Sequence, residues 1–171
     1  GFSEYGFPES HAASFALLVY ASCWIKRHEP AAFLTALLNS QPMGFYTPSQ
    51  LVQDARRHGV EVRAVDVMHS AVETTLEDLP GTPAVRLGLH RVQGLRTASA
   101  QRIVAERHKA PFNSAEALAR RARLEQSEMK LLAAGGALAS LSGHRRQQVW
   151  DAAALHAPPA LLHDAGVVCT V

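Results

Sequence analysis

The chain has 171 residues, of which 47% are hydrophobic and 19% are charged. This length is enough for one domain or two small ones with a real core, and this composition excludes a disordered chain. The longest apolar run, about residues 15–25, is shorter than the roughly 20 residues that span a bilayer, and no basic leader with an apolar core begins the chain. We therefore expect neither a membrane partner nor a secretory signal.

Charge is distributed unevenly along the chain, although the net charge is only +2. Residues 1–85 hold five Lys and Arg against nine Asp and Glu, whereas residues 86–123 hold nine against two. Such a basic block predicts a polyanionic partner for the second half of the chain. Cys23 and Cys169 lie far apart in the sequence, which argues against a disulfide framework and fits the reducing cytoplasm.

Two helices are expected first. Residues 10–28 are apolar on nearly every helical face, and a helix of this kind is typically buried in a larger protein. Ser10 is well placed to cap its N-terminus. Pro30 suits the first position of the second helix, which covers 30–39.

A third helix and a small β element follow. Thr47 and Pro48 suit the N-cap and the first residue of the helix, and Gly59 suits the position that ends it. The alternation of apolar and polar residues over 60–67 predicts a strand. The stretches "ETTLE" and "AVRLGL" predict the two strands of a hairpin around "DLPGTP".

The rest of the chain is predicted to be helical, with short connections that contain glycine. Asn113 and Glu116 resemble a capping box at the start of one helix. Gly135 and Gly136 are expected to end a later helix, the one over 126–134. The expected helices cover 98–107, 114–123, 126–134 and 143–155. The predicted fold class is therefore mainly α, with a small β element between two helical regions.

The first candidate site is "VQGLRTASAQRIVAER", which has the hydrophobic–x–Gly–hydrophobic pattern of a helix-hairpin-helix. The glycine allows a tight turn, and the amides of Gly94, Leu95 and Arg96 are then expected to face outward at a helix N-terminus, where a phosphate is favoured. Arg91, Arg96 and Arg102 add positive charge for DNA binding that does not depend on sequence. The alternative is a helical hairpin with a solvated basic face.

The second candidate site is "LLAAGGALASLSGHRRQQVW", in which a helix, a glycine turn at Gly135 and Gly136, and further helix follow one another. His144, Arg145 and Arg146 stand at a helix start, which again suits a phosphate. Two such hairpins in tandem make a compact unit that can meet both strands of a duplex. The alternative for this stretch is ordinary helix packing.

The third candidate is the cluster of Glu9, Ser10 and His11. A catalytic triad is not expected here, because triad members converge from different elements rather than from consecutive positions. The histidines show no metal-ligand spacing, and the chain has neither a Gly-rich nucleotide loop nor a carboxylate pair that suggests a two-metal site. We therefore expect no catalytic residue and no metal site in this chain.

The residues quoted above also carry a family resemblance. "YGFPESHAASFALLVYASCWIKRHEPAAFLTALLNSQP" resembles the fingers segment of bacterial C-family DNA polymerases, the alpha subunits of DNA polymerase III. The Pro-Glu-Ser-His version of this segment, followed by "ALLNSQPMGFY", resembles the error-prone branch, which works in damage-induced mutagenesis and translesion synthesis. "GLHRVQGL" and the second candidate site are similar to the family's tandem helix-hairpin-helix region, so the resemblance covers about 1–155.

This resemblance implies a division of the chain and roles for its residues. Ser10 and His11 would face the incoming nucleotide, and Gly94, Leu95 and Arg96 would form the phosphate-binding turn. The implied domains are late fingers over 1–68, a β element or linker over 69–90, tandem hairpins over 91–155 and a tail over 156–171.

The resemblance also implies what lies outside this chain. The catalytic palm, whose aspartates hold two Mg²⁺ ions for nucleotidyl transfer, is expected upstream, so this piece has no cofactor of its own and is expected to be inactive alone. The implied partners are primer–template DNA, the incoming dNTP and the remaining polymerase domains. A sliding clamp and mutagenesis accessory proteins would bind through other regions.

Two other classes of function remain open on the residues alone. One is a stand-alone helix-hairpin-helix module that binds DNA without a polymerase role. The other is a purely structural helical domain. The apolar first helix weighs against a stand-alone protein, because such a helix requires more protein around it.

Overall fold

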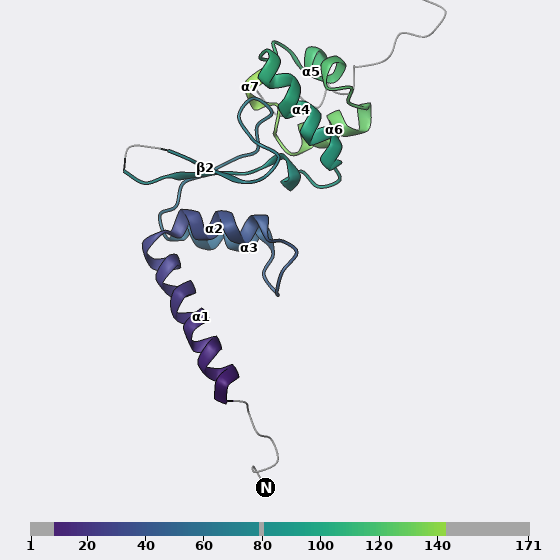
Figure 1. Cartoon of the computed structure of the whole chain (residues 1–171). Helices are drawn as coiled ribbons and strands as arrows, with labels where there is room; N and C mark the ends of the chain where they lie inside the picture. The colour runs from purple at the N-terminus through teal and green to yellow at the C-terminus, as the bar shows by residue number, and fades with distance from the viewer. Residues whose placement is uncertain (1–8, 79–80, 143–171) are drawn as a thin grey trace, which may run out of the picture. The chain divides into compact units, whose positions relative to one another are not determined.

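The computed structural model describes residues 9–78 and 81–142, which fall into two compact units (Figure 1). The first, called here the N-terminal unit, is drawn from Gly1–Arg63 and Glu73–Leu87. The second, called the hairpin unit, is drawn from Ala64–Val72 and Gly88–Val171. The chain therefore leaves the N-terminal unit, returns to it and leaves it again.

The N-terminal unit begins with the three predicted helices, α1 (Glu9–His28), α2 (Pro30–Asn39) and α3 (Pro48–Arg57). The prediction of Ser10 as an N-cap is wrong, because α1 already includes Glu9 and Ser10 lies inside its first turn. Figure 1 shows α1 as a long helix that meets the rest of its unit only near its C-terminal end.

Local chemistry sets the limits of α3. The Gln50 N–H donates to Thr47 Oγ1 over 3.3 Å, and the Thr47 N–H donates to Gln50 Oε1 over 2.9 Å, which completes a capping box. At the other end Gly59 has a φ of 84°, and the Val60 N–H donates to Ala55 O over 3.0 Å. These are the features of a Schellman turn, so the predicted roles of Thr47 and Gly59 are confirmed.

A three-stranded sheet completes this unit, with the order β1 (Val62–Arg63), β3 (Ala84–Arg86), β2 (Thr75–Glu77). β2 and β3 pair antiparallel, as the predicted hairpin requires, whereas β1 pairs parallel with β3, which the sequence did not predict. The strand predicted over 60–67 is shorter than expected. The apolar residues of this stretch are buried in two different places: Val60 lies in the N-terminal unit, and Val65 and Val67 lie in the hairpin unit. The alternating pattern therefore does not mark one continuous strand.

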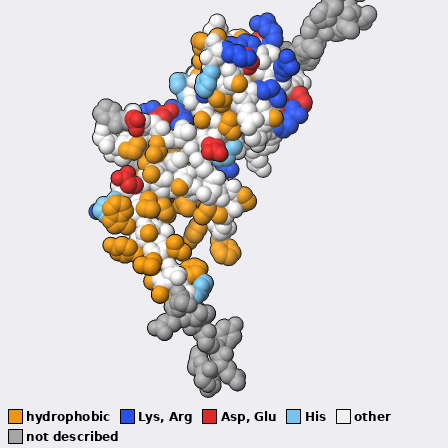
Figure 2. All heavy atoms as spheres, in the orientation of Figure 1, with side chains coloured by type: hydrophobic (Ala, Val, Ile, Leu, Met, Phe, Trp, Pro, Cys, Tyr) orange, Lys and Arg blue, Asp and Glu red, His pale blue; other side chains and the backbone are white. Residues whose placement is uncertain are grey.

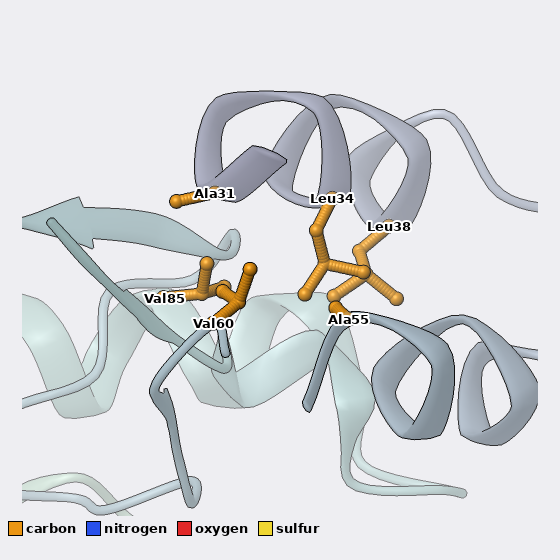
Figure 3. Close-up of a cluster of buried hydrophobic side chains, with 6 residues drawn as sticks. All are labelled: Ala31, Leu34, Leu38, Ala55, Val60 and Val85. Carbon is orange, nitrogen blue, oxygen red and sulfur yellow. The ribbon is translucent and has the colours of Figure 1, made fainter. Parts of the chain in front are cut away.

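One face of α2 supplies the core of the N-terminal unit (Figure 3). Leu34 and Leu38 point from α2 toward Ala55 of α3, and Val60 and Val85 lie nearby. The side chains that line this core, buried or partly buried, are Ala31, Leu34, Leu38, Ala55, Val60, Val85, Leu51, Val52, Val62 and Leu87. Burial of this apolar face is what fixes α2 on the sheet and on α3.

Two polar links join the sheet to its surroundings. Asn39, the last residue of α2, donates its side-chain amide to Thr74 O over 2.9 Å and accepts the Thr74 N–H over 2.9 Å. Glu77 on β2 accepts hydrogen bonds from Arg86 on β3 and from Arg63 on β1, both at distances below 2.8 Å. The bond from Arg86 is the main reason why the pKa of Glu77 is lowered.

The hairpin unit contains a 3₁₀ turn and four helices among the described residues. They are η1 (Leu89–Arg91), α4 (Thr97–Lys109), α5 (Ala115–Arg121), α6 (Gln126–Ala134) and α7 (Ala139–Ser142). Ser114 rather than Asn113 caps α5, because its hydroxyl accepts the Ala117 N–H over 3.1 Å. The helix predicted over 143–155 lies outside the described residues. The expected fold class, mainly α with a small β element, is confirmed.

The apolar side chains of α1 are exposed in the part of the chain that the structure describes. Leu17 is 73% exposed and Tyr20 is 72% exposed, and Figure 2 shows orange side chains on the visible face of this helix. The other large apolar residues exposed on α1 are Phe15, Leu18, Val19, Trp24 and Ile25. Among residues 9–78 and 81–142, no helix is both long enough and apolar enough to cross a membrane.

Substitution of Leu38 tests the importance of the α2 core. Leu38 is fully buried, so Leu38→Ala should lower the free energy of unfolding by about 2–5 kcal/mol. Leu17→Ala is the matched control, because the same atoms are removed from an exposed position. Urea denaturation followed by circular dichroism measures both variants, and equal effects would contradict the described packing.

Candidate nucleic-acid interface

The first predicted hairpin is present between η1 and α4. The Val92 N–H donates to Leu89 O over 3.0 Å, and the Leu95 N–H donates to Val92 O over 3.1 Å, so the chain reverses within a few residues. Gly94 has a φ of 83°, a conformation that glycine adopts without strain. A Cβ at this position would lie 3.2 Å from Leu131 Cδ1 on α6. Gly94 therefore allows both the turn and its close approach to α6.

Of the three amides expected to face outward at this hairpin, one is used within it. The Leu95 N–H is used inside the turn, so it does not face a ligand. The first intrahelical bonds of α4 are made by the N–H groups of Ser99 and Ala100 to Arg96 O. The N–H groups of Thr97 and Ala98 thus precede the helical ladder, at the positive end of the helix dipole, where they suit an anion. The sequence would have indicated these two residues if Arg96 had been placed as the N-cap.

Arg96 is the N-cap residue of α4, and its guanidinium is bound within the unit. Its Nε donates to Glu128 Oε1 over 3.0 Å, and one terminal nitrogen donates to Glu125 Oε1 over 2.7 Å. Both acceptors belong to the start of α6, so Arg96 ties the first hairpin to that helix. Its side chain is nevertheless 57% exposed, so the charge stays close to the surface.

Glu128 is the buried member of this group, with only 4% of its side chain exposed. Burial alone would raise its pKa, but hydrogen bonds from Arg96, from the Ser99 hydroxyl and from the Glu125 N–H outweigh that effect. Together they lower the pKa of Glu128 to about 2. The carboxylate is therefore ionised in the folded protein and joins α4 to α6.

Arg102, another of the predicted arginines, also has a structural role. Arg102 lies in α4, and its guanidinium donates to Ala122 O over 2.8 Å, to Ser99 Oγ over 2.9 Å and to Arg123 O over 3.3 Å. Arg91 is the last residue of η1 and is half-buried. The basic block therefore holds the unit together as well as charging it. Arginines bound to carbonyl oxygens keep their full charge, and Figure 2 shows blue side chains gathered on the hairpin unit.

The second glycine turn ends α6 and precedes α7. Gly136 has a φ of 72°, its N–H donates to Ala133 O over 3.0 Å, and the Ala137 N–H donates to Leu132 O over 2.9 Å, which forms a Schellman turn. A Cβ on Gly135 would lie 3.7 Å from Val92 Cγ2 of the first hairpin. The two glycine turns are therefore neighbours. His144, Arg145 and Arg146 lie outside the described residues.

The remaining predicted site residues belong to the N-terminal unit. Ser10 lies in the first turn of α1, and the ring of His11 packs edge-on against Phe15 with 4.4 Å between the ring centroids. In the part of the chain that the structure describes, no group of three or more His, Cys, Asp and Glu is arranged to hold a metal ion. The roles of Ser10 and His11 toward a nucleotide remain predictions.

The lowered pKa of Glu128 predicts a pH dependence of stability. Its contribution is complete above the ordinary pKa of 4.5 and is lost as the pH falls through about 2. Glu128→Gln should therefore be less stable than the parent chain at pH 7, and the difference should shrink toward pH 2. The control is Glu116→Gln, an exposed acid on α5. Urea titrations from pH 7 to pH 2 test this, and a constant difference across that range would contradict it.

Comparison with known proteins matches both the hairpins and the whole sequence. A family model described as a helix-hairpin-helix motif matches residues 59–148. An error-prone DNA polymerase of Azoarcus sp. (strain BH72) is 64% identical over 90% of this chain but only 15% of its own length. Error-prone DNA polymerases of Aromatoleum aromaticum and Bordetella parapertussis are each 59% identical, over 98% and 99% of this chain and 16% of theirs.

These relatives confirm the predicted resemblance to the error-prone branch, and the chain spans only about one-sixth of their length. The family match covers the two glycine turns and the helices that carry them. The chain therefore belongs to the helix-hairpin-helix family and is similar, over nearly all of its length, to one segment of error-prone DNA polymerases.

Proposed function

We propose that this chain is a segment of an error-prone DNA polymerase alpha subunit and that its hairpin unit holds duplex DNA by the phosphate backbone. The observation that carries the proposal is the pairing of two glycine turns. Gly94 packs on Leu131 of α6, and the same helix ends at Gly135, beside Val92. Two adjacent helix-hairpin-helix turns suit two phosphate groups of one duplex, as expected for tandem hairpins.

Contact with DNA occurs mainly through the main chain in this proposal. The N–H groups of Thr97 and Ala98 bind one phosphate at the start of α4, while the basic block attracts the duplex over a longer range. Neither contact reads a base, so binding does not depend on sequence. Arg96 and Arg102 contribute charge and hold the hairpin in shape, and His144, Arg145 and Arg146 supply the second phosphate site.

The N-terminal unit is proposed to be the late part of the polymerase fingers, with Ser10 and His11 toward the incoming nucleotide. The exposed apolar side chains of α1 support this, because a surface of that kind requires cover by other protein. The occupant proposed is the rest of the polymerase. The same uncovered helix weighs against the alternative, a stand-alone DNA-binding module.

The activity proposed for the whole protein is DNA-directed nucleotidyl transfer during damage-induced mutagenesis and translesion synthesis. Its two Mg²⁺ ions would be held by a palm domain outside this chain, which supplies no catalytic residue. Primer–template DNA and dNTPs are the proposed substrates. A sliding clamp and mutagenesis accessory proteins are proposed partners through other regions, and the cytoplasm is the proposed location.

Thr97→Pro tests the main-chain contact. Proline is tolerated at the first position of a helix, and Arg96, with φ −68° and ψ 138°, already has the backbone conformation that precedes proline. The variant therefore removes one N–H group from a folded hairpin. Duplex affinity should fall by about tenfold, because a hydrogen bond to a charged group is lost. The slope of log K against log salt should change little, because no cation is removed.

Thr97→Ala is the matched control, since it removes the same side chain and keeps the N–H group. Fluorescence anisotropy of a labelled duplex over a salt series measures all three proteins. Equal affinity of the proline and alanine variants would contradict the main-chain contact. If the parent chain shows no salt-dependent binding, the proposed DNA role is wrong and a structural role remains.

Primer extension tests the proposed division of labour between this chain and the rest of the polymerase. With primer–template, dNTPs and Mg²⁺, the 171-residue chain should incorporate no nucleotide, whereas a full-length polymerase that contains this segment should extend the primer. The full-length protein without Mg²⁺ is the negative control. Nucleotide incorporation by the chain alone would contradict the proposal that catalysis resides elsewhere.

A further inference from the structure

Arg123 has a backbone conformation that normally belongs to glycine. Its φ is 50°, and it is the one non-glycine residue with a positive φ among those that the structure describes. It follows α5, where the Leu124 N–H donates to Ala119 O over 2.9 Å and the Arg123 N–H donates to Arg120 O over 3.4 Å. These bonds form a Schellman turn, in which the left-handed position favours glycine because a Cβ crowds the backbone there.

The turn that contains Arg123 lies beside the start of α4. Arg102 donates to the carbonyl oxygens of Ala122 and Arg123, and the same guanidinium donates to Ser99 Oγ over 2.9 Å. Ser99 belongs to the first turn of α4, which presents the N–H groups proposed to bind a phosphate. Arg102 thus fixes the backbone of Arg123 next to the first hairpin.

The side chain of Arg123 forms no direct polar contact with the described residues of the fold. Its neighbour Arg121 is bound inward, with donors to Ala110 O at 2.8 Å and Pro111 O at 3.0 Å. Arg123, in contrast, is exposed, and within residues 9–78 and 81–142 its guanidinium has no hydrogen bond or ion pair.

The acids near Arg123 are already paired. Glu106 binds Lys109 over 2.6 Å, and Glu125 binds Arg96 over 2.7 Å. The guanidinium of Arg123 therefore makes no ion pair with either acid, and its charge acts on Glu106 only at longer range, where it helps to lower the pKa of that acid after the larger effects of Lys109 and Arg121. A strained backbone that carries an unpaired charge points to a role for that charge outside the fold.

We propose that Arg123 binds a phosphate of the DNA backbone beside the one held at the start of α4, and that this contact accounts for an arginine at a position that favours glycine. The inference rests on the proposed DNA-binding function and adds a residue to it. The partner is duplex nucleic acid, because a duplex places successive phosphates within reach of both groups and the contact needs no base.

The test compares Arg123→Gly with Arg123→Lys in the 171-residue chain. Arg123→Gly removes both the charge and the backbone strain, so its thermal unfolding midpoint should be at least that of the parent chain. Its duplex affinity should fall about three- to tenfold at low salt, and the salt slope should shrink by about one unit, as expected for one lost phosphate contact. Arg123→Lys should keep the slope and most of the affinity.

Arg57→Gln is the charge-matched control, because Arg57 is an exposed cation on α3 of the N-terminal unit. Equal affinity and slope for Arg123→Gly and the parent chain, or a loss no larger than that of Arg57→Gln, would overturn the contact. A lower unfolding midpoint for Arg123→Gly would overturn the explanation by strain. If the parent chain binds and Thr97→Pro weakens binding while Arg123→Gly does not, this inference fails and the proposed function stands.

Discussion

The hairpin unit depends on a carboxylate that its own helices bury. An unpaired charge at Glu128 would be strongly destabilising, because little water reaches it. Its partners are Arg96 at the end of the first hairpin, the Ser99 hydroxyl in the first turn of α4 and the Glu125 N–H before α6. One ionised group therefore sets the position of a turn, of the helix after it and of the helix that leads to the second turn.

This arrangement changes how the basic block should be understood. A run of arginines before and within a DNA-binding unit suggests a surface that exists to meet phosphate. In this chain Arg96, Arg102 and Arg121 are instead bound to carboxylate or carbonyl oxygens of the unit itself. Carbonyl oxygens do not neutralise a guanidinium, so Arg102 holds the fold together and still makes the unit attractive to a polyanion. Arg96, in contrast, is paired with the carboxylates of Glu125 and Glu128, so its part in holding the fold is the larger one. Stability and long-range attraction are thus supplied by shared residues.

Sequence reasoning succeeded where local chemistry decides the outcome. Thr47, Gly59 and Gly94 have their predicted roles because caps and positive-φ turns are determined within a few residues. It failed where the result depends on distant partners. The parallel pairing of β1 with β3, and the capture of Arg96 by Glu128, join residues more than 20 positions apart, and no pattern in one sequence indicates such contacts.

The chain leaves the N-terminal unit twice, so each unit is built from two separate segments of sequence. This limits where the chain can be cut into independently folded pieces. Ala64–Val72 belongs to the hairpin unit, since Val67 donates its N–H to Ala137 O and accepts from Arg107. A piece that starts at Gly88 would lack those partners. A piece that starts at Ala64 would keep them, but it would carry β2 and β3 without β1 and without α2, whose Leu38 belongs to the same core as Val85. No single cut therefore yields both intact hairpins and a covered sheet, so neither unit can be separated from the other without losing packing partners.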